Sequence, residues 1–257
     1  MEIIIVCIAS LAASALTLFS GFGLGTLLMP VVAIFFPVEI AIAVTAMVHL
    51  ANNLFKAALL GGKADPSVLF RFGMPAVLFA FIGAWALGRL AGMPPIFEYA
   101  AWGRPMQVSP VNLMVGLLIL CFVILELSSK FASLSLDKKY LSLGGAVSGF
   151  FGGLSGHQGA FRSLFLLKAG LDKERFIATG VMLAVMVDMS RLLMYGWEMA
   201  AHPPDMDWRL VASASISAFA GAYLGAKLVK KLTIRTIQGA VSALLIIVAL
   251  GLIFGAL

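Results

Sequence analysis

Three of the eighteen basic residues of this chain lie inside apolar stretches: Lys56, Arg162 and Arg191. A charged side chain within a membrane is unfavourable unless it meets a partner or a water-filled cavity, so each of the three points to a functional site. Arg162 is the most informative, because it follows a glycine-rich segment after which a half-helix would begin. A helix start favours anions through its free N–H groups, and a guanidinium adds two parallel donors. We therefore expect Arg162 to bind an oxyanion; the alternative is that it neutralises Asp188 or caps carbonyl groups.

The glycine-rich segment itself carries Ser155, His157 and Gln158, whose side chains could complete the coordination of an anion. Its Gly-Leu-Ser-Gly sequence, residues 153–156, also matches the Gly-x-Ser-Gly of rhomboid proteases. Nucleophilic catalysis needs a base within hydrogen-bond reach of the serine. The later histidines are His157, two residues away, and His202, in a proline-flanked loop. An intramembrane serine protease that uses Ser155 therefore stays as an alternative to anion binding.

A second polar cluster lies in the apolar stretch that contains Lys56. His49, Asn52 and Asn53 precede the lysine, and Asn52 is four residues before it and so on the same helix face. Such groups often only bond neighbouring helices together. We predict that Asn52, Asn53 and Lys56 line the site from the first half of the chain.

Asp188 lies deep in a third apolar stretch, and Arg191 follows three residues later on the same helix face. This spacing predicts an ion pair. A carboxylate that is paired with arginine can still act as a gate, so we assign Asp188, Arg191 and His49 to gating or proton coupling. Lys56 and Arg191 each lie within about one turn of a helix end, so the alternative is that their charged ends extend to the membrane surface.

These residues belong to two stretches that read as copies of each other. Ser20-Gly21-Phe22 recurs as Ser148-Gly149-Phe150, 128 residues later. Two further sets recur at offsets of 135 and 138: Glu39, Ala43, Met47 and Lys56 match Glu174, Ala178, Met182 and Arg191, and residues 80–85 match residues 218–223. Each copy begins with an apolar segment that glycines interrupt, and paired interrupted segments are the best sequence pointer to a transporter site. We therefore add Gly23 and Gly25, from the first interruption, to the substrate site.

The composition places these stretches in a membrane. Of the 257 residues, 61% are hydrophobic and only 12% are charged, whereas a soluble domain has roughly 25% charged residues. The net charge of +6 is spread over short loops, as expected for residues that orient a membrane protein. No basic arm suits a nucleic acid, and no Cys/His spacing suits a metal site. We expect no cofactor and no metal.

Eight apolar runs are expected to enter the membrane. They cover about Ile3–Phe36, Ile40–Leu60, Val68–Leu90, Val111–Leu127, Tyr140–Leu167, Phe176–Tyr195, Trp208–Val229 and Ile234–Phe254. The first run has 34 residues and would reach about 51 Å as one helix, whereas a hydrocarbon core is about 30 Å thick. Glycines 21, 23 and 25 interrupt this run, and glycines 152, 153, 156 and 159 interrupt the fifth run in a similar way.

The distribution of lysine and arginine separates two topologies. If all eight runs cross once, six basic residues face one side and nine the other. This split is too even to define the orientation of the protein in the membrane. If the first and fifth runs are re-entrant hairpins, twelve share one face and three the other, and the rich face is the cytoplasmic one. We therefore predict inverted repeats with six full crossings and two hairpins, and keep eight plain transmembrane helices as the alternative. Residues 3–20 are long enough to span alone, so the form of the first run stays open.

The predicted fold class is thus an all-α membrane protein in which residues 1–257 form a single membrane domain. Residues 1–128 make the first repeat and residues 139–257 the second, with a short polar stretch between them. The loops Ala91–Pro110 and Met199–Asp207 are expected outside the cell.

The glycine-interrupted segments, their duplication and the chain length resemble the TauE/SafE family of sulfite-exporter-like permeases, over nearly the whole chain. Gly21-Phe22-Gly23-Leu24-Gly25 with Pro30 is close to the family's Gly-x-Gly-Gly-Gly-x-x-x-x-Pro pattern. The second segment, from Ser148 to Arg162, keeps the Ser-Gly start but has His-Gln-Gly-Ala and Arg in place of the triple glycine and proline, as in a distinct branch. The family is associated with sulfite, sulfonates and other organosulfur anions. The resemblance therefore implies an anion permease and not an enzyme.

We expect the protein to move a small anion, first of all sulfite or an organosulfonate, by alternating access at a midplane site. A passive anion channel is a further alternative. The expected location is the cell inner membrane, with the Lys/Arg-rich loops in the cytoplasm. The expected partners are the anionic substrate and the lipid bilayer, with no nucleic acid; a homodimer stays open.

Overall fold

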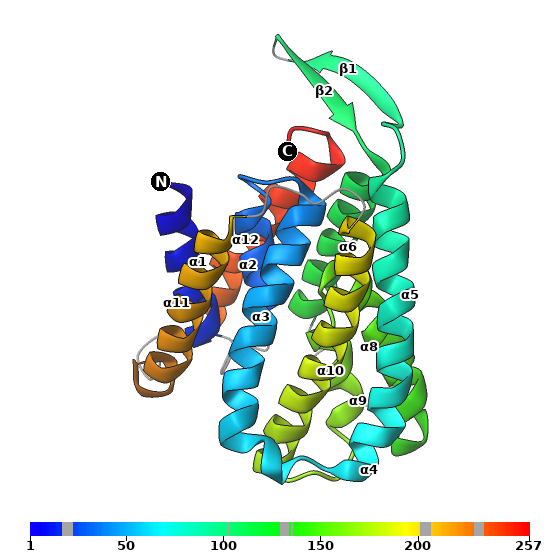
Figure 1. Cartoon of the computed structure of the whole chain (residues 1–257), viewed down its shortest axis with the longest axis vertical. Coiled ribbons are helices and arrows are strands. Elements are labelled where there is room, and N and C mark those ends of the chain that lie inside the picture. Colours follow the sequence, from blue (N-terminus) through cyan, green and yellow to red (C-terminus); the bar gives the residue numbers. More distant parts are fainter. Residues whose placement is uncertain (17–22, 102, 129–133, 135, 201–206, 229–233) are drawn as a thin grey trace.

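The computed structural model describes residues 1–16, 23–101, 103–128, 134, 136–200, 207–228 and 234–257, and most of them are helical (Figure 1). The predicted all-α membrane class is therefore confirmed in its coarse form. Ser20, Gly21 and Phe22 of the first repeated motif and His202 lie outside the described residues.

The first half of the chain forms the helices α1 to α6. Their bounds are α1 Glu2–Leu16, α2 Leu24–Val32, α3 Val38–Leu60, α4 Pro66–Val68, α5 Met74–Ala91 and α6 Pro110–Leu127. A 3-10 turn, η1 (Gly61–Lys63), follows α3, and a π-helical turn, η2 (Leu69–Gly73), joins α4 to α5. Asp65 and Ser109 accept hydrogen bonds from the first turns of α4 and α6, and a proline follows each of them, so both helix starts are fixed locally.

The second half forms the remaining elements. Its elements are η3 Lys138–Tyr140, α8 Leu141–Ser155, α9 Gly159–Leu166, α10 Lys173–Met199, α11 Trp208–Leu228 and α12 Ile234–Ile253. Asp172 caps α10 by accepting a hydrogen bond from the backbone N–H of Arg175.

Within the described residues, four continuous stretches are long and apolar enough to cross a membrane. They are Val38–Ala58, Pro66–Ala91, Pro110–Leu127 and Lys173–Glu198. Many large apolar side chains on these helices, such as Leu78, Leu117, Ile124 and Leu193, are exposed, as expected for a lipid-facing surface. The interior is instead filled by small and aliphatic residues of several helices.

The helices of the two halves are packed against each other rather than side by side as separate bundles. α5 lies along α8, and α1 lies along α11. α3 packs on α10, and α6 packs on α12, along the long axis of the molecule (Figure 1). These contacts therefore pack helices of the two halves against one another.

Glycines allow close backbone approaches at these contacts, and two of them are Gly83 and Gly221. A Cβ atom at Gly83 of α5 would lie 2.1 Å from the carbonyl oxygen of Phe150 in α8. A Cβ atom at Gly221 of α11 would lie 2.2 Å from the carbonyl oxygen of Leu11 in α1. Gly83 and Gly221 match in the sequence repeat, and both serve the same kind of backbone approach.

The connection from α5 to α6, expected as a loop, contains an antiparallel β-hairpin. Its strands are β1 Phe97–Ala101 and β2 Arg104–Val108, and Gly103 in the turn has φ +74°. The hairpin projects from one end of the molecule, near the end of α12, and α4 lies at the opposite end (Figure 1). The Tyr99 hydroxyl donates to the carbonyl oxygen of Phe254 and so fastens β1 to the chain after α12. Below, the two ends are called the hairpin end and the α4 end.

Candidate functional site

The second glycine-rich segment is a sharp break between two short helices. α8 ends at Ser155, and Gly156 has φ +82°, a left-handed conformation that suits glycine and few other residues. A Cβ atom at Gly156 would also lie 3.0 Å from the Nη1 atom of Arg191. α9 then starts at Gly159. Position 156 thus needs glycine for its backbone conformation and for the close packing of Arg191.

The first glycine-rich segment meets the second one inside the molecule. Gly23 precedes α2, and Gly25 lies in its first turn. A Cβ atom at Gly25 would lie 3.5 Å from the carbonyl oxygen of Gly156 and 3.9 Å from the methyl group of Thr45. Neither α2 nor α9 has a side-chain cap at its start, so the free N–H groups of both first turns are available to a ligand.

Asp188 lies at the centre of the site. Its side chain is fully buried, and Arg191 is 1% exposed. Arg191 donates to Oδ1 of Asp188 from Nε at 3.0 Å and from Nη2 at 2.7 Å, which confirms the predicted ion pair. Gln158 donates to the same oxygen at 3.1 Å, and His49 lies 2.5 Å from Oδ2. The carboxylate therefore has partners from α3, from the second break and from α10, as a buried charge requires.

The first-half residues predicted to line the site lie beside this carboxylate. Asn53 Nδ2 lies 3.2 Å from Nε2 of His49, and Ser14 donates to Oδ1 of Asn52 at 3.3 Å. An amide N–H can only donate, so this arrangement describes a neutral imidazole whose Nδ1–H donates to Asp188. Rotation of the Asn53 amide by 180° would present its oxygen to a protonated ring, so Asn53 can satisfy either protonation state.

Lys56 and Arg162 lie closer to the α4 end. Lys56 is seven residues beyond His49 on α3, or about 10 Å along the helix. Lys56 lies near the end of α3, and Arg162 lies in the first turn of α9. Arg162 donates to the side-chain oxygen of Gln158 at 3.4 Å, and a Cβ atom at Gly180 would lie 3.7 Å from its Nε atom. Arg162 forms no ion pair with Asp188, which pairs with Arg191 and accepts hydrogen bonds from Gln158 and His49.

No carboxylate of the described residues forms an ion pair with Lys56 or Arg162. One cation comes from each half of the chain, and both are in helices that are otherwise apolar. Each such cation is unfavourable in a membrane unless an anion or water lies beside it. The sequence left open that Asp188 neutralises Arg162 directly. The structure has no ion pair between these two residues.

Ser155 and His157 contact each other, as a protease would require. Nδ1 of His157 lies 3.1 Å from Oγ of Ser155, but that hydroxyl donates its proton to the carbonyl oxygen of Phe151 at 3.2 Å. The imidazole must then donate to the serine instead of accepting from it, which is the reverse of general-base activation. The imidazole ring also stacks on Phe122, with ring centroids 4.8 Å apart.

Three buried polar atoms of the site have no hydrogen-bond partner in the described part of the chain. They are Oγ1 of Thr45, Nδ2 of Asn52 and Nε2 of His157. Buried polar groups are nearly always satisfied, so atoms of this kind mark the place of a ligand or of water. Thr45 was not predicted from sequence, although its position four residues before His49 puts it on the same helix face. Ser14 and Tyr195, which donates to the carbonyl oxygen of Gly153, were also not predicted.

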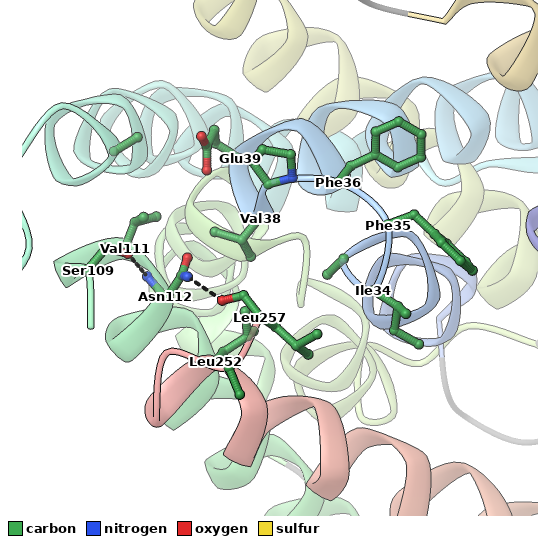
Figure 2. A pocket seen from close by; sticks show the side chains of 14 residues that line it. Ile34, Phe35, Phe36, Val38, Glu39, Ser109, Val111, Asn112, Leu252 and Leu257 are labelled. Carbon is green, nitrogen blue, oxygen red and sulfur yellow. Dashed lines mark hydrogen bonds between the residues drawn. The ribbon is translucent and has the colours of Figure 1, made fainter. Parts of the chain in front are cut away.

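A separate cavity of about 480 Å³ opens at the hairpin end. Figure 2 shows its lining from the end of α2, the start of α3 and the end of α12, with Asn112 donating to the backbone oxygen of Leu257. Glu39 lies on its wall. From Glu39 to His49 α3 runs ten residues, so the cavity wall at Glu39 lies about 15 Å along the helix from the buried cluster.

The α4 end is closed by contacts between the halves. Lys63 pairs with Glu174 at 2.6 Å, and Arg175 pairs with Asp65 at 2.6 Å. The backbone N–H of Asp65 also donates to the hydroxyl of Thr179 at 2.9 Å. These bonds hold the segment after α3 against the start of α10. Among the described residues, no group of three or more His, Cys, Asp or Glu side chains is arranged to hold a metal ion.

The described chain is therefore a helical membrane protein with a buried, charged site at two helix breaks, which is the class of architecture that secondary transporters use. Residues 6–252 match the family described as Sulfite exporter TauE/SafE, and the chain belongs to this family of integral membrane transporters. Comparison with curated proteins and with solved structures gave no match.

Proposed function

We propose that the protein is an inner-membrane permease that moves a small anion, sulfite or an organosulfonate, by alternating access. The observation that carries this proposal is the pair of cations at the helix breaks. Lys56 from the first half and Arg162 from the second form no ion pair with an acidic residue among the described residues. The helix starts of α2 and α9, which have no side-chain cap, and the atoms Nδ2 of Asn52 and Nε2 of His157, which have no partner among the described residues, add neutral groups to the same region.

The packing supports an inverted repeat with two re-entrant hairpins. Suppose that the repeat relates α1 to α8, α3 to α10, α5 to α11 and α6 to α12. The contact of α1 with α11 then has its counterpart in the contact of α8 with α5. The contacts of α3 with α10 and of α6 with α12 then map onto themselves, as contacts across a pseudo-twofold axis do. In this arrangement α1 with α2, and α8 with α9, are the hairpins, and the helix breaks lie inside protein where irregular backbone is tolerated.

The α4 end is the cytoplasmic side in this proposal. It carries Lys63, Arg71, Lys138, Lys173 and Arg175, in agreement with the positive-inside rule. The hairpin end, with the cavity of about 480 Å³, then faces outside. The structure corresponds to a state that is closed on the cytoplasmic side, because the ion pairs of Asp65 and Glu174 join the halves there.

Asp188, Arg191 and His49 serve as the gating and proton-coupling group in this proposal. Asp188 holds the two halves together through His49, and the imidazole is the group whose charge changes most readily near neutral pH. Transport that couples to protons would be expected to lose its pH dependence in His49→Gln, while anion binding at Arg162 persists. Unchanged pH dependence in this variant would remove His49 from the coupling role.

The proposal is tested by counterflow in proteoliposomes, with labelled sulfite, taurine and sulfoacetate. Wild-type protein should show saturable exchange of at least one anion, and Arg162→Ala should abolish it because the guanidinium is lost. Arg104→Ala, which removes an exposed arginine of β2, is the matched control and should leave exchange unchanged. Equal exchange in wild type and Arg162→Ala would refute the assigned site. Flux that does not saturate and does not respond to pH or sodium would indicate a passive anion channel.

An intramembrane serine protease is the second candidate, favoured only by the 3.1 Å contact of Ser155 with His157. A protease would react with serine-directed covalent probes and lose that reaction in Ser155→Ala. A permease would not be labelled, and Ser155→Ala would retain exchange apart from a reduced affinity.

A further inference from the structure

We propose that an apolar cavity between α1, α2 and α12 holds the end of a lipid acyl chain. The cavity has a volume of about 140 Å³, and its described wall contains none of the charged residues of the site above. The inference does not depend on which molecule the protein transports. One of its steps uses the inverted repeat proposed above.

The cavity lies where three helices of the two halves meet (Figure 1). Its wall includes Ala12 and Leu16 of α1, Leu27 of α2, and Leu244 and Leu245 of α12, and the described residues on it are only alanine, valine and leucine. An apolar cavity of about 150 Å³ inside a soluble protein stays free of water and takes up benzene or xenon. The cavity of this chain is similar in size and lining, so its occupant should also be apolar.

The cavity adjoins the lipid-facing surface. Ala12 and Leu244, both on its wall, are exposed, and so are the neighbouring Ile8 of α1 and Ile247 of α12. Hydrocarbon surrounds such a face in a bilayer, so acyl chains are the apolar molecules available at the opening. A void leaves the atoms of its wall without partners on one side, and a chain end that enters it restores those contacts.

The position of the cavity favours the end of the acyl chain over the lipid headgroup. α1 ends at Leu16, and Leu27 lies in the first turn of α2, so the cavity is next to the first helix break. Helix breaks of this kind lie near the bilayer midplane, where acyl chains end. The described wall has no charged or hydrogen-bonding side chain that could hold a headgroup.

Aromatic side chains fill the corresponding place in the second half. Phe122 of α6, Phe151 of α8 and Phe161 of α9 meet there, with ring centroids between 5.1 and 5.7 Å apart. In the proposed repeat, α1, α2 and α12 correspond to α8, α9 and α6. Each set of three helices therefore joins one hairpin to the last helix of the other half. Below, α1, α2 and α12 form the first junction, and α8, α9 and α6 form the second.

One matched position explains the difference between the junctions. A glycine of α11 approaches the backbone of α1 at Leu11, and a glycine of α5 approaches the backbone of α8 at Phe150. The next residues along the chain are Ala12 and Phe151. A methyl group therefore stands where the second junction has a phenyl ring. The chain completes the second junction by itself, whereas an acyl chain completes the first.

The test is photo-crosslinking in vesicles of phosphatidylethanolamine and phosphatidylglycerol. The vesicles also contain a phosphatidylcholine that carries a diazirine near the end of one acyl chain, and crosslinked residues of the full chain are mapped by mass spectrometry. Leu27 and Leu245 of the cavity wall are 8% and 1% exposed, so bulk lipid does not reach them. Both should be labelled severalfold more strongly than Ile119, a buried core residue of α6.

Ala12→Phe should close the cavity, because it places on α1 the ring that α8 has at Phe151. Labelling of Leu27 should then fall to the level of the buried core residue. Ile247→Phe is the matched control, since it adds a ring at an exposed position of α12 outside the cavity wall. It should keep the labelling of the wild type. In detergent, added phospholipid should raise the unfolding midpoint of the wild type more than that of Ala12→Phe.

The opposite substitution tests the inference even if Ala12→Phe does not fold. Phe151→Ala removes one ring from the second junction and leaves a cavity between α6, α8 and α9. Phe122, which is 3% exposed in the wild type, should then be crosslinked severalfold more strongly than before.

The outcomes separate this inference from the proposed function. If Leu27 and Leu245 of the wild type are labelled no more than Ile119, the inference is wrong, whether water, detergent or a second copy of the chain fills the cavity. Unchanged strong labelling in folded Ala12→Phe would also refute it, because the chain end would then lie elsewhere. Anion exchange is measured in the same vesicles. Strong labelling without any exchange would refute the proposed function and leave the acyl-chain site standing.

Discussion

His49 of α3 and Asp188 of α10 lie 2.5 Å apart, although 139 positions separate them in the chain. This contact joins the two halves at the level of the helix breaks, and it is made between groups that are both buried. Asp188 is at the same time the partner of Arg191 and Gln158. The stability of the domain and the proposed chemistry of the site thus depend on one carboxylate.

Removal of the Asp188 charge should destabilise the protein strongly. Asp188→Asn keeps the size of the side chain but leaves the buried Arg191 without its counter-ion. Loss of one partner of a buried ion pair lowers the free energy of unfolding by about 3–5 kcal/mol. The decrease is measured by denaturant unfolding in detergent micelles.

Glu174→Gln is the matched control, because it makes the same chemical change at an exposed ion pair. Its unfolding midpoint should be the same as that of wild type. An Asp188→Asn variant as stable as this control would show that Asp188 does not hold the halves together. Asp188→Asn combined with Arg191→Gln should lose less than the sum of the single variants, because the unpaired charge is then gone.

The break after α8 should require glycine at one position and tolerate alanine at another. Gly156→Ala forces a Cβ atom into the left-handed conformation at φ +82°, which is unfavourable by about 1–2 kcal/mol, and brings it against Arg191. Gly159 begins α9, and a Cβ atom there meets no atom within 4 Å. Gly159→Ala should therefore be neutral or slightly stabilising. Equal unfolding midpoints for the two variants would contradict the described conformation of Gly156.

The repeat-matched glycines of α5 and α11 should both be intolerant of a methyl group. Gly83→Ala and Gly221→Ala would each press a Cβ atom onto a backbone carbonyl oxygen, at 2.1 Å and 2.2 Å, so that two helices must separate. We expect a loss of folded protein in both, measured as the monodisperse fraction in size-exclusion chromatography. Gly196→Ala in α10 is the control, since nothing lies within 4 Å of its Cβ position. Wild-type yield of either variant would contradict the close approach at that glycine.

The ion pairs at the α4 end should control access from that side. Asp65→Asn combined with Glu174→Gln removes both pairs between the halves. In a background without Cys7 and Cys121, a cysteine at Val181, near the level of Lys56, reports on opening. The double variant should raise the labelling rate of Val181→Cys by a membrane-impermeant maleimide severalfold when the reagent is added on the α4 side. An unchanged rate would mean that these pairs do not hold that end closed.

Ionic strength, rather than moderate changes of pH, should weaken the exposed pair at this end. The hydrogen bond and the charge of Glu174 raise the pKa of Lys63 above its usual value. Because the folded-state pKa is raised, the favourable contribution of the lysine charge is present below the ordinary pKa and is lost only as the pH rises through the raised value. Labelling of Val181→Cys should therefore rise with salt. Between neutral and mildly alkaline pH its rate should rise only as much as that of a cysteine in the unfolded protein, which reports the increase in thiolate.

Local patterns were enough to predict several parts of the site. The ion pair of Asp188 with Arg191 follows from a spacing of three residues on one helix. The helix break follows from a cluster of glycines, which a long continuous helix does not tolerate well. These features depend only on the geometry of a single element. The same reasoning did not predict the β-hairpin, whose strands depend on contacts such as Tyr99 with Phe254, 155 positions away.

The register of the repeat shows the same limit. A short Ser-Gly-Phe match suggested an offset of 128 for the first segments, whereas the close approaches at Gly83 and Gly221 relate Leu11 to Phe150. Three residues of one helix recur easily by chance in a sequence rich in small and apolar types. Packing against α5 and α11 decides the register, because only glycine permits a helix backbone to come so close.

The sequence by itself determined that this chain is a membrane protein with paired helix breaks and a few buried charges, because composition, glycine positions and helical spacing act over short stretches. Only the tertiary structure decided which of these charges neutralise one another. It brings His49 to Asp188, places Gln158 between Asp188 and Arg162, and leaves Lys56 and Arg162 without an acidic partner in the described residues. The reason is physical: electrostatic balance in a membrane is set by distances across packed helices, and those distances are not encoded in the spacing along any one of them.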